Sequence, residues 1–194
     1  MKKKIFRVIS SGLLICILLF SIIKIKTVNE TYENPVNIVY TEGEKIVGNN
    51  LSISVYKSEL LSSDKFEEKY GEMDDAGHLM ELSSDSQDMM VLLIDFLVEN
   101  TGKEEVNFVG TDFIAESGAW ANGWSMEMFI HVNNSDGVSI PVKPNEKIYV
   151  KFPFCAYSTQ FKKDSWDNIK KREFYVVLSS YPVKNKIKLE PEIW

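Results

Sequence analysis

An uncharged apolar run near the N-terminus constrains this chain more than any other feature. Residues 8–23 read VISSGLLICILLFSII, sixteen residues without a charge, bracketed by Arg7 and Lys24. A helix of sixteen residues spans about 24 Å, and apolar neighbours extend it toward the roughly 30 Å hydrocarbon core of a bilayer. The run predicts a membrane-spanning helix, with the rest of the chain folding beyond it.

A cleaved signal peptide has a similar length and is the alternative reading. Cleavage requires small residues at positions −3 and −1, and no such pair lies between Leu18 and Glu30. A lipoprotein signal requires a small residue before its cysteine, but Ile15 precedes Cys16. We therefore expect an anchor that stays on the protein.

Positive charge sets the orientation of such an anchor. Four basic residues precede the apolar run and two follow it. The N-terminus is therefore expected in the cytoplasm, in a single-pass protein of the cell membrane. We expect a basic tail and anchor over residues 1–26, a polar tether over 27–36, and an extracytoplasmic domain over 37–194.

The part beyond the anchor is strongly acidic. All 28 acidic residues follow Lys26, against 16 of the 22 basic residues, which gives a formal net charge of −12 there. Such a charge disfavours nucleic acid and anionic lipid headgroups as partners. It would suit a cationic partner, although solubility alone also explains it. Lysine outnumbers arginine twenty to two, which is typical of a low-GC bacterial gene.

Alternating apolar residues indicate strands throughout residues 37–194. Leu51, Ile53 and Val55 alternate with polar neighbours. Residues 89–98 (MMVLLIDFLV) form the most hydrophobic stretch outside the anchor and predict a central strand. One face of this strand is expected in the core, and it consists of Met90, Leu92, Ile94, Phe96 and Val98. The other face begins apolar and ends with Asp95 and Glu99, so it emerges from cover.

Further strands are expected along the rest of the domain. They cover residues 106–109, 112–116, 126–132, 148–154, 174–178 and 187–189. Two short helices are expected at 64–70, begun by Asp64 and stopped by Gly71, and at 163–171. Eight or nine strands at this spacing predict an all-β fold, an immunoglobulin-like antiparallel β-sandwich with one or two short helices after a single transmembrane helix.

Four stretches carry a resemblance to a known group of proteins. They are LLIDFLVENTGKEEVNF (92–108), the glycine- and tryptophan-rich segment 118–124, KPNEKIYVKFPF (143–154) and LSSYPVKNKIKL (178–189). Together with the anchor, the chain resembles membrane-anchored, immunoglobulin-like modules of Gram-positive envelopes, in particular a family of unknown function from Clostridia-type bacteria. The resemblance implies a fold and supplies no catalytic residues.

Cys155 is the candidate nucleophile, because it is the one cysteine beyond the anchor. Sortases, which are anchored all-β thiol transpeptidases, use a cysteine, a histidine and an arginine. His78, His131 and Arg172 would supply the last two. However, the cysteine follows KFPF instead of the Thr-Leu-x-Thr run of sortases. A buried, unreactive thiol is the simpler interpretation, and we expect no enzyme.

The histidines also bear on metal binding. His78 and His131 lie 53 positions apart, which gives no zinc-ligand spacing with one cysteine. We expect neither a metal nor a cofactor.

The WANGW segment is the most suggestive binding feature. Trp120 and Trp124 flank Asn122, and indole rings stack on sugars and anchor peptide partners. Alternatively, one or both rings plug the end of the sandwich. We predict that these three residues contribute to a contact surface for a ligand or partner.

The sequence therefore favours a non-catalytic, membrane-anchored, extracytoplasmic binding or protein-interaction module of the cell envelope. Its partner would be an envelope protein, a peptide or a glycan. Two alternatives stay open. One is a sortase-like thiol transpeptidase that uses Cys155, and the other is an accessory subunit of an envelope transporter or sensor.

Overall fold

The computed structural model describes residues 2–32, 35–48, 50–71 and 88–194, with side chains from residue 12 onward. The chain divides into two compact units, residues 1–36 and 37–194. Helix α1 (Lys2–Thr31) makes up most of the first unit. Its segment Gly12–Thr31 is long and apolar enough to cross a membrane, as a signal sequence also would be. The helix continues through Thr27–Thr31, so the first part of the expected tether is helical.

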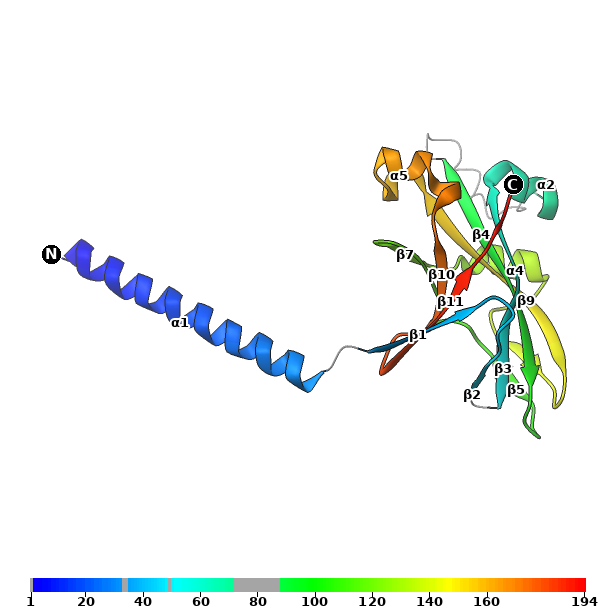
Figure 1. The fold of residues 1–194 in the computed structure, drawn as a ribbon, viewed down its shortest axis with the longest axis horizontal. Coiled ribbons are helices and arrows are strands. Elements are labelled where there is room, and N and C mark those ends of the chain that lie inside the picture. The colour runs from blue at the N-terminus through cyan, green and yellow to red at the C-terminus, as the bar shows by residue number, and fades with distance from the viewer. Residues whose placement is uncertain (1, 33–34, 49, 72–87) are drawn as a thin grey trace. The chain divides into compact units, whose positions relative to one another are not determined.

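The second unit is a β-sandwich, as predicted (Figure 1). Sheet A has the strand order β1 (Val36–Thr41), β11 (Val183–Leu189), β10 (Phe174–Ser179), β6 (Ile114–Ser117), β7 (Trp120–Gly123). Sheet B has the order β12 (Glu192–Ile193), β3 (Leu51–Ser62), β4 (Met89–Asn100), β9 (Lys147–Tyr157), with β2 (Ile46–Gly48) beside β3. A small separate sheet pairs β5 (Val106–Phe108) with β8 (Ile140–Val142). The β10–β11, β10–β6, β6–β7, β2–β3, β3–β4, β4–β9 and β5–β8 pairs are antiparallel, whereas β12 pairs with β3 in parallel.

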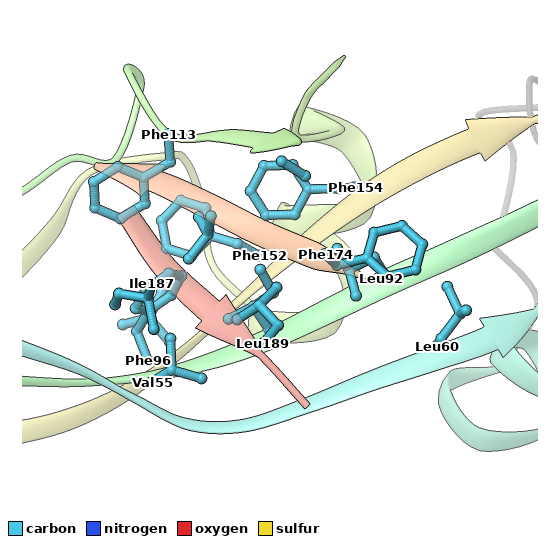
Figure 2. Packing of buried hydrophobic residues seen from close by; sticks show 14 of the residues in the cluster. Val55, Leu60, Leu92, Phe96, Phe113, Phe152, Phe154, Phe174, Ile187 and Leu189 are labelled. Carbon is cyan, nitrogen blue, oxygen red and sulfur yellow. The ribbon is translucent and has the colours of Figure 1, made fainter. Parts of the chain in front are cut away.

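The core lies between sheets A and B, and strand alternation builds it (Figure 2). The predicted inward face of β4 is fully buried there, opposite Phe152 and Phe154 from β9 in register. Sheet A contributes Phe174 and Val176 from β10, with Ile187 and Leu189 from β11. Because side chains alternate along a strand, each apolar residue at every second position enters this one core.

Strand β3 changes its alternation at a bulge. Val55 faces the core opposite Phe96, and the register then shifts between Val55 and Lys57. Tyr56 lies in the bulge and is exposed. After the bulge Leu60 takes the inward position, so the extra residue redirects the rest of the strand.

Helix α2 (Ser63–Tyr70) covers part of the outer face of sheet B, as the predicted helix at 64–70 indicated. The capping residue differs, because Ser62 and not Asp64 accepts the hydrogen bond that begins the helix. Gly71 ends it with φ 83°, a backbone conformation that glycine adopts at low cost. Phe66 is buried in a second apolar cluster with Val91 and Leu93 of β4.

The predicted strand at 126–132 is wrong, because this segment forms helix α4 (Met126–Asn133). Ser125 caps its start, and Asn134 ends it in the left-handed conformation with φ 46°. Met128 enters the outer cluster beneath the helix, whereas Phe129 enters the main core. The apolar residues of this segment fit both a two-residue and a helical repeat, and the pair of flanking caps decides for the helix.

The last predicted helix, at 163–171, is divided in two. Helix α5 (Lys163–Asp167) ends at Asn168, and the 3-10 turn η2 (Ile169–Lys171) follows. An earlier 3-10 turn, η1 (Ser158–Gln160), leads from β9 toward this region. Ile169 is buried in the main core and fixes the segment against the sandwich.

Candidate functional site

Trp120 lies in the core at the edge of sheet A, in β7. It is 7% exposed, and its ring packs against Phe161 and Phe174 at centroid distances of 5.7 and 6.3 Å. Its indole Nε1 donates a hydrogen bond to Gln160 Oε1 at 2.9 Å. Both the ring and its donor are therefore satisfied within the domain.

Trp124 is half-buried and also packs inward. Its ring lies 4.9 Å from Phe129 and 5.3 Å from Phe152, centroid to centroid, and Nε1 donates to the Gly110 carbonyl at 2.7 Å. Both indole rings therefore pack into the sandwich, which is the alternative considered from the sequence. A binding role for Trp120 and Trp124 stays a prediction that this packing does not favour.

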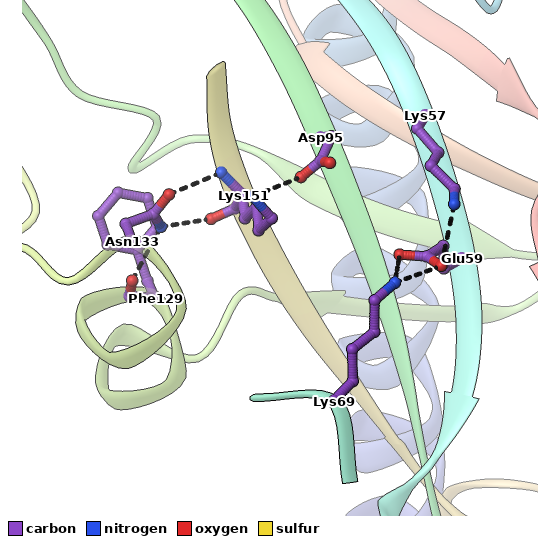
Figure 3. A network of polar contacts seen from close by, with 7 residues as sticks. All are labelled: Lys57, Glu59, Lys69, Asp95, Phe129, Asn133 and Lys151. Atoms are coloured by element: carbon purple, nitrogen blue, oxygen red, sulfur yellow. Dashed lines mark hydrogen bonds and ion pairs between the residues drawn. The ribbon is translucent and has the colours of Figure 1, made fainter. Parts of the chain in front are cut away.

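Asn122 contacts the free edge of β9 together with two other residues of the same segment. Its Nδ2 donates to the Cys155 carbonyl at 2.8 Å, and the Ser125 N–H donates to the Pro153 carbonyl at 2.8 Å. Asn133 bonds both the N–H and the carbonyl of Lys151, at 2.9 and 2.8 Å (Figure 3). These contacts supply hydrogen bonds to backbone groups of every second residue of an edge strand. Asn122 therefore has a structural role.

Cys155 is buried on the outer face of sheet B. It is 5% exposed, and its Sγ lies 3.3 Å from Met128 Sδ. Burial raises the pKa of its thiol to about 11, so the thiolate is scarce at neutral pH.

Among the described residues, neither His131 nor Arg172 forms a hydrogen bond with Cys155. His131 Nε2 contacts the Tyr70 carbonyl at 2.9 Å, and Arg172 contacts Ser117 of sheet A. His78 lies outside the described residues. Within the described ranges, no group of three or more Asp, Glu, His or Cys side chains could hold a metal ion.

A pocket of about 440 Å³ lies on the outer face of sheet A. Its lining combines both signs of charge with one aromatic ring, from Glu116, Ser117, Gly118, Arg172, Glu173, Tyr175 and Lys186. Strand register brings them together, because Tyr175 of β10 lies opposite Glu116 of β6 and Lys188 of β11. This pocket is the candidate binding site.

The two carboxylates of the pocket have partners outside its lining. Glu116 is paired with Lys184, and Glu173 with Lys188 at 2.7 Å. The hydrogen bond from Lys188 lowers the pKa of Glu173, so this side chain is ionised at neutral pH. Both acidic groups are thus held in place by lysines of β11.

Arg172 is held at the rim of the pocket by three contacts. Its Nε donates to Ser117 Oγ at 2.9 Å, and its Nη2 donates to the Ser117 carbonyl at 2.6 Å. Its guanidinium carbon also lies 5.4 Å from the centre of the Phe161 ring. Gly118, at φ 61°, permits this approach, because a Cβ there would lie 2.8 Å from Nη2.

Sequence reasoning missed this pocket, because its residues come from separate segments that only the sheet brings together. One signal pointed toward it. Among the 16 basic residues beyond the anchor, Arg172 is the one arginine. Arginine differs from lysine because it presents a planar fork of donors. A lone arginine among lysines is therefore a candidate binding group.

The sequence profile of a family described as a domain of unknown function (DUF5028) matches residues 28–185. No curated protein matches the chain. Among solved structures, an uncharacterised β-sandwich protein from Clostridium difficile 630 is 13% identical, with a TM-score of 0.44, over 81% of this chain and 97% of that one. The yjhA protein from Bacillus subtilis is 12% identical, with a TM-score of 0.42, over 78% and 99%. A conserved hypothetical protein from Bacillus anthracis is 10% identical, with a TM-score of 0.44, over 77% and 95%.

Proposed function

The chain belongs to the DUF5028 family of domains of unknown function, and from this premise we propose that it is a non-catalytic, membrane-anchored binding module. Helix α1 holds it in the cytoplasmic membrane, and the β-sandwich acts outside the cell as part of the envelope. Its partner is an envelope protein, a peptide or a glycan, and not nucleic acid.

The pocket on sheet A is the observation that carries this proposal. Its two cations, Arg172 and Lys186, have no carboxylate within 4 Å among the described residues, whereas its two acids are paired. A structural ion-pair network would use these cations internally. Charges that a fold orients but leaves unpaired are available to a partner.

The burial of Cys155 supports the non-catalytic part of the proposal. A nucleophilic cysteine requires access and a lowered pKa, and this thiol has neither. A thiol reagent applied to the folded full-length protein at neutral pH should label Cys155 slowly, and quickly after denaturation. Labelling within seconds in the folded state would contradict the proposal and favour the transpeptidase.

The binding role is tested by capture from the protein's own membranes. The tagged full-length chain is cross-linked in intact cells, and a variant carrying Arg172→Gln and Lys186→Gln is compared with Lys143→Gln, an exposed lysine outside the pocket. We expect a partner that the native chain and the Lys143 variant retain and the double variant loses. Identical captured material from all three proteins would overturn the assignment of the pocket.

A further inference from the structure

The pocket on sheet A has a distinct charge balance in an acidic domain. Residues beyond the anchor carry a formal net charge of −12. Here Lys184 and Lys188 neutralise Glu116 and Glu173. Arg172 and Lys186 then remain as a local positive excess at the pocket, among the described residues.

Arg172 presents its unused donors in a fixed geometry. A guanidinium has five N–H groups, and the contacts with Ser117 use one from Nε and one from Nη2. Among the described residues nothing else bonds to the guanidinium, so the end formed by Nη1 and Nη2 keeps two parallel donors. That arrangement matches two oxygens of one carboxylate or phosphate. Since Ser117 and the Phe161 ring already hold the side chain, little conformational entropy is lost when an anion binds.

Lys186 forms no ion pair within 4 Å among the described residues, although its charge also helps to lower the pKa of Glu173. Its Nζ lies 4.1 Å from the centre of the Tyr175 ring, which is a cation–π contact. The ring orients the ammonium group, and the three N–H donors of the ammonium stay available to an oxygen ligand. The second cation of the pocket is thus oriented by the Tyr175 ring and is not tied up in an ion pair of the described residues.

We propose that this pocket binds the oxyanion group of a ligand, a carboxylate or a phosphate, between Arg172 and Lys186. The inference rests on the proposed binding function and names the ligand chemistry of the same site. Arg172 supplies a two-pronged hydrogen bond through its free end, and Lys186 supplies a second charge.

The test uses nuclear magnetic resonance of the isotope-labelled full-length chain in neutral detergent micelles. Acetate and inorganic phosphate are added separately, with chloride keeping the ionic strength constant. At least one of them should give saturable shifts at Gly118, at Tyr175 and at the Arg172 Nε–H. Shifts that grow linearly without saturation, or that spread over the whole surface, would overturn the proposal.

Two variants assign the shifts to the cations. Lys186→Gln removes a charge without removing any hydrogen bond of the described residues, and it should weaken the apparent affinity about tenfold. Arg172→Lys keeps the charge but loses the fork, and it should weaken binding by a similar factor. Lys143→Gln, the matched loss of charge elsewhere, should leave affinity unchanged. Equal affinities in all four proteins would exclude this pocket as the anion site.

A lipid arm identifies the source of the oxyanion. The acetate and phosphate titrations are repeated in nanodiscs of phosphatidylcholine alone and with added phosphatidylglycerol. Competition by phosphatidylglycerol supports the proposal with a lipid phosphate as the ligand, and equal titrations support it with a soluble ligand. Anion binding without any captured partner would contradict the envelope-partner function alone, whereas a captured partner without anion binding would contradict this inference alone.

Discussion

Glu59 and Asp95 lie on neighbouring strands of sheet B (Figure 3). Their surroundings shift the pKa values of the two carboxyl groups in opposite directions. Burial raises the pKa of Glu59, but hydrogen bonds from Lys69 and Lys57 outweigh it and lower the pKa below its usual value of 4.5. Burial also raises the pKa of Asp95, and Lys151, at 3.7 Å, does not compensate. Ionisation of Glu59 stabilises the fold, and ionisation of Asp95 destabilises it.

Replacing Glu59 by glutamine should therefore lower stability in a pH-dependent way. At pH 7 we expect a loss of about 1–2 kcal/mol in the free energy of unfolding, because Lys57 and Lys69 stay partly exposed and can be rehydrated. The lowered pKa means that this contribution is present above about pH 4.5 and is lost as pH falls through the folded-state pKa. Urea unfolding at pH 7 and in acid measures the difference.

Asp95→Asn should change the free energy of unfolding at pH 7 in the opposite direction. A raised folded-state pKa makes the native protein less stable as pH rises through the range between the two pKa values. The asparagine variant should therefore be more stable than the native protein at pH 7 and lose that advantage in acid. A Glu59→Gln loss that is equal at both pH values would show that packing, not charge, is responsible.

Trp120→Ala should destabilise the sandwich strongly. The ring fills the core beside Phe174, and its removal leaves a cavity and takes away one of the two hydrogen bonds that Gln160 Oε1 accepts. We expect a loss of about 3–5 kcal/mol, which lowers the melting temperature by about 10 °C. Trp194→Ala is the control, because that side chain is half exposed. An unchanged melting temperature with lost partner capture would instead support the predicted contact role.

Strand β9 lies at an edge of sheet B, and its backbone groups are protected there from pairing with other chains. It ends the strand order of sheet B, so no strand of the described residues lies beside its outer N–H and carbonyl groups. Unpaired edge groups favour unwanted pairing with other chains. The segment from β7 through α4 covers them by way of Asn122, Ser125 and Asn133. The helical conformation of residues 126–133 places Asn133, the last residue of α4, where it bonds the N–H and the carbonyl of Lys151 at this edge.

Asn133→Ala tests this role. The substitution removes two hydrogen bonds to Lys151 and one to the Phe129 carbonyl, and it leaves the backbone of β9 unsatisfied. We expect a loss of about 2–3 kcal/mol in the free energy of unfolding and faster hydrogen exchange at the Lys151 amide. Asn134→Gly is the matched control, since φ 46° at that position accepts glycine. Equal stability of both variants would contradict the edge-capping role.

At the scale of the whole molecule, the chain joins an apolar N-terminal helix to an acidic β-sandwich. Six basic residues precede Thr27, four of them before the apolar run, and a net charge of −12 follows. Positive residues are retained on the cytoplasmic side of a membrane. The span Gly12–Thr31 could serve as a membrane anchor or as a signal sequence, and an anchored domain that faces outward stays a prediction from this charge asymmetry.

Protease treatment of intact cells tests this topology. A tag placed after Trp194 should be digested without lysis, while a cytoplasmic control protein stays intact. The mass of the membrane-bound chain should show that residues 8–23 are retained. A tag protected until lysis, or a mature chain that begins after Ile23, would contradict the anchored arrangement.

The faces of the long strands could be predicted because alternation is a local property. The inward set on β4 and the alternating set on β9 follow from apolar residues at every second position. The helix at 126–133 could not be separated from a strand in this way, since its short apolar pattern fits both repeats. The pocket could not be predicted at all, because its residues belong to segments as far apart as Glu116 and Lys186.

The amino-acid sequence by itself determined the apolar helix, the acidic character of the rest, and the strands that bury one face. Those properties depend on neighbouring residues and their spacing. Only the tertiary structure decided that Trp120 is covered, that Cys155 is sealed beneath α4, and that Arg172 and Lys186 line one pocket. Burial and charge balance depend on what the opposite sheet and the adjacent strands bring into contact, and strand register fixes those contacts across long separations in sequence.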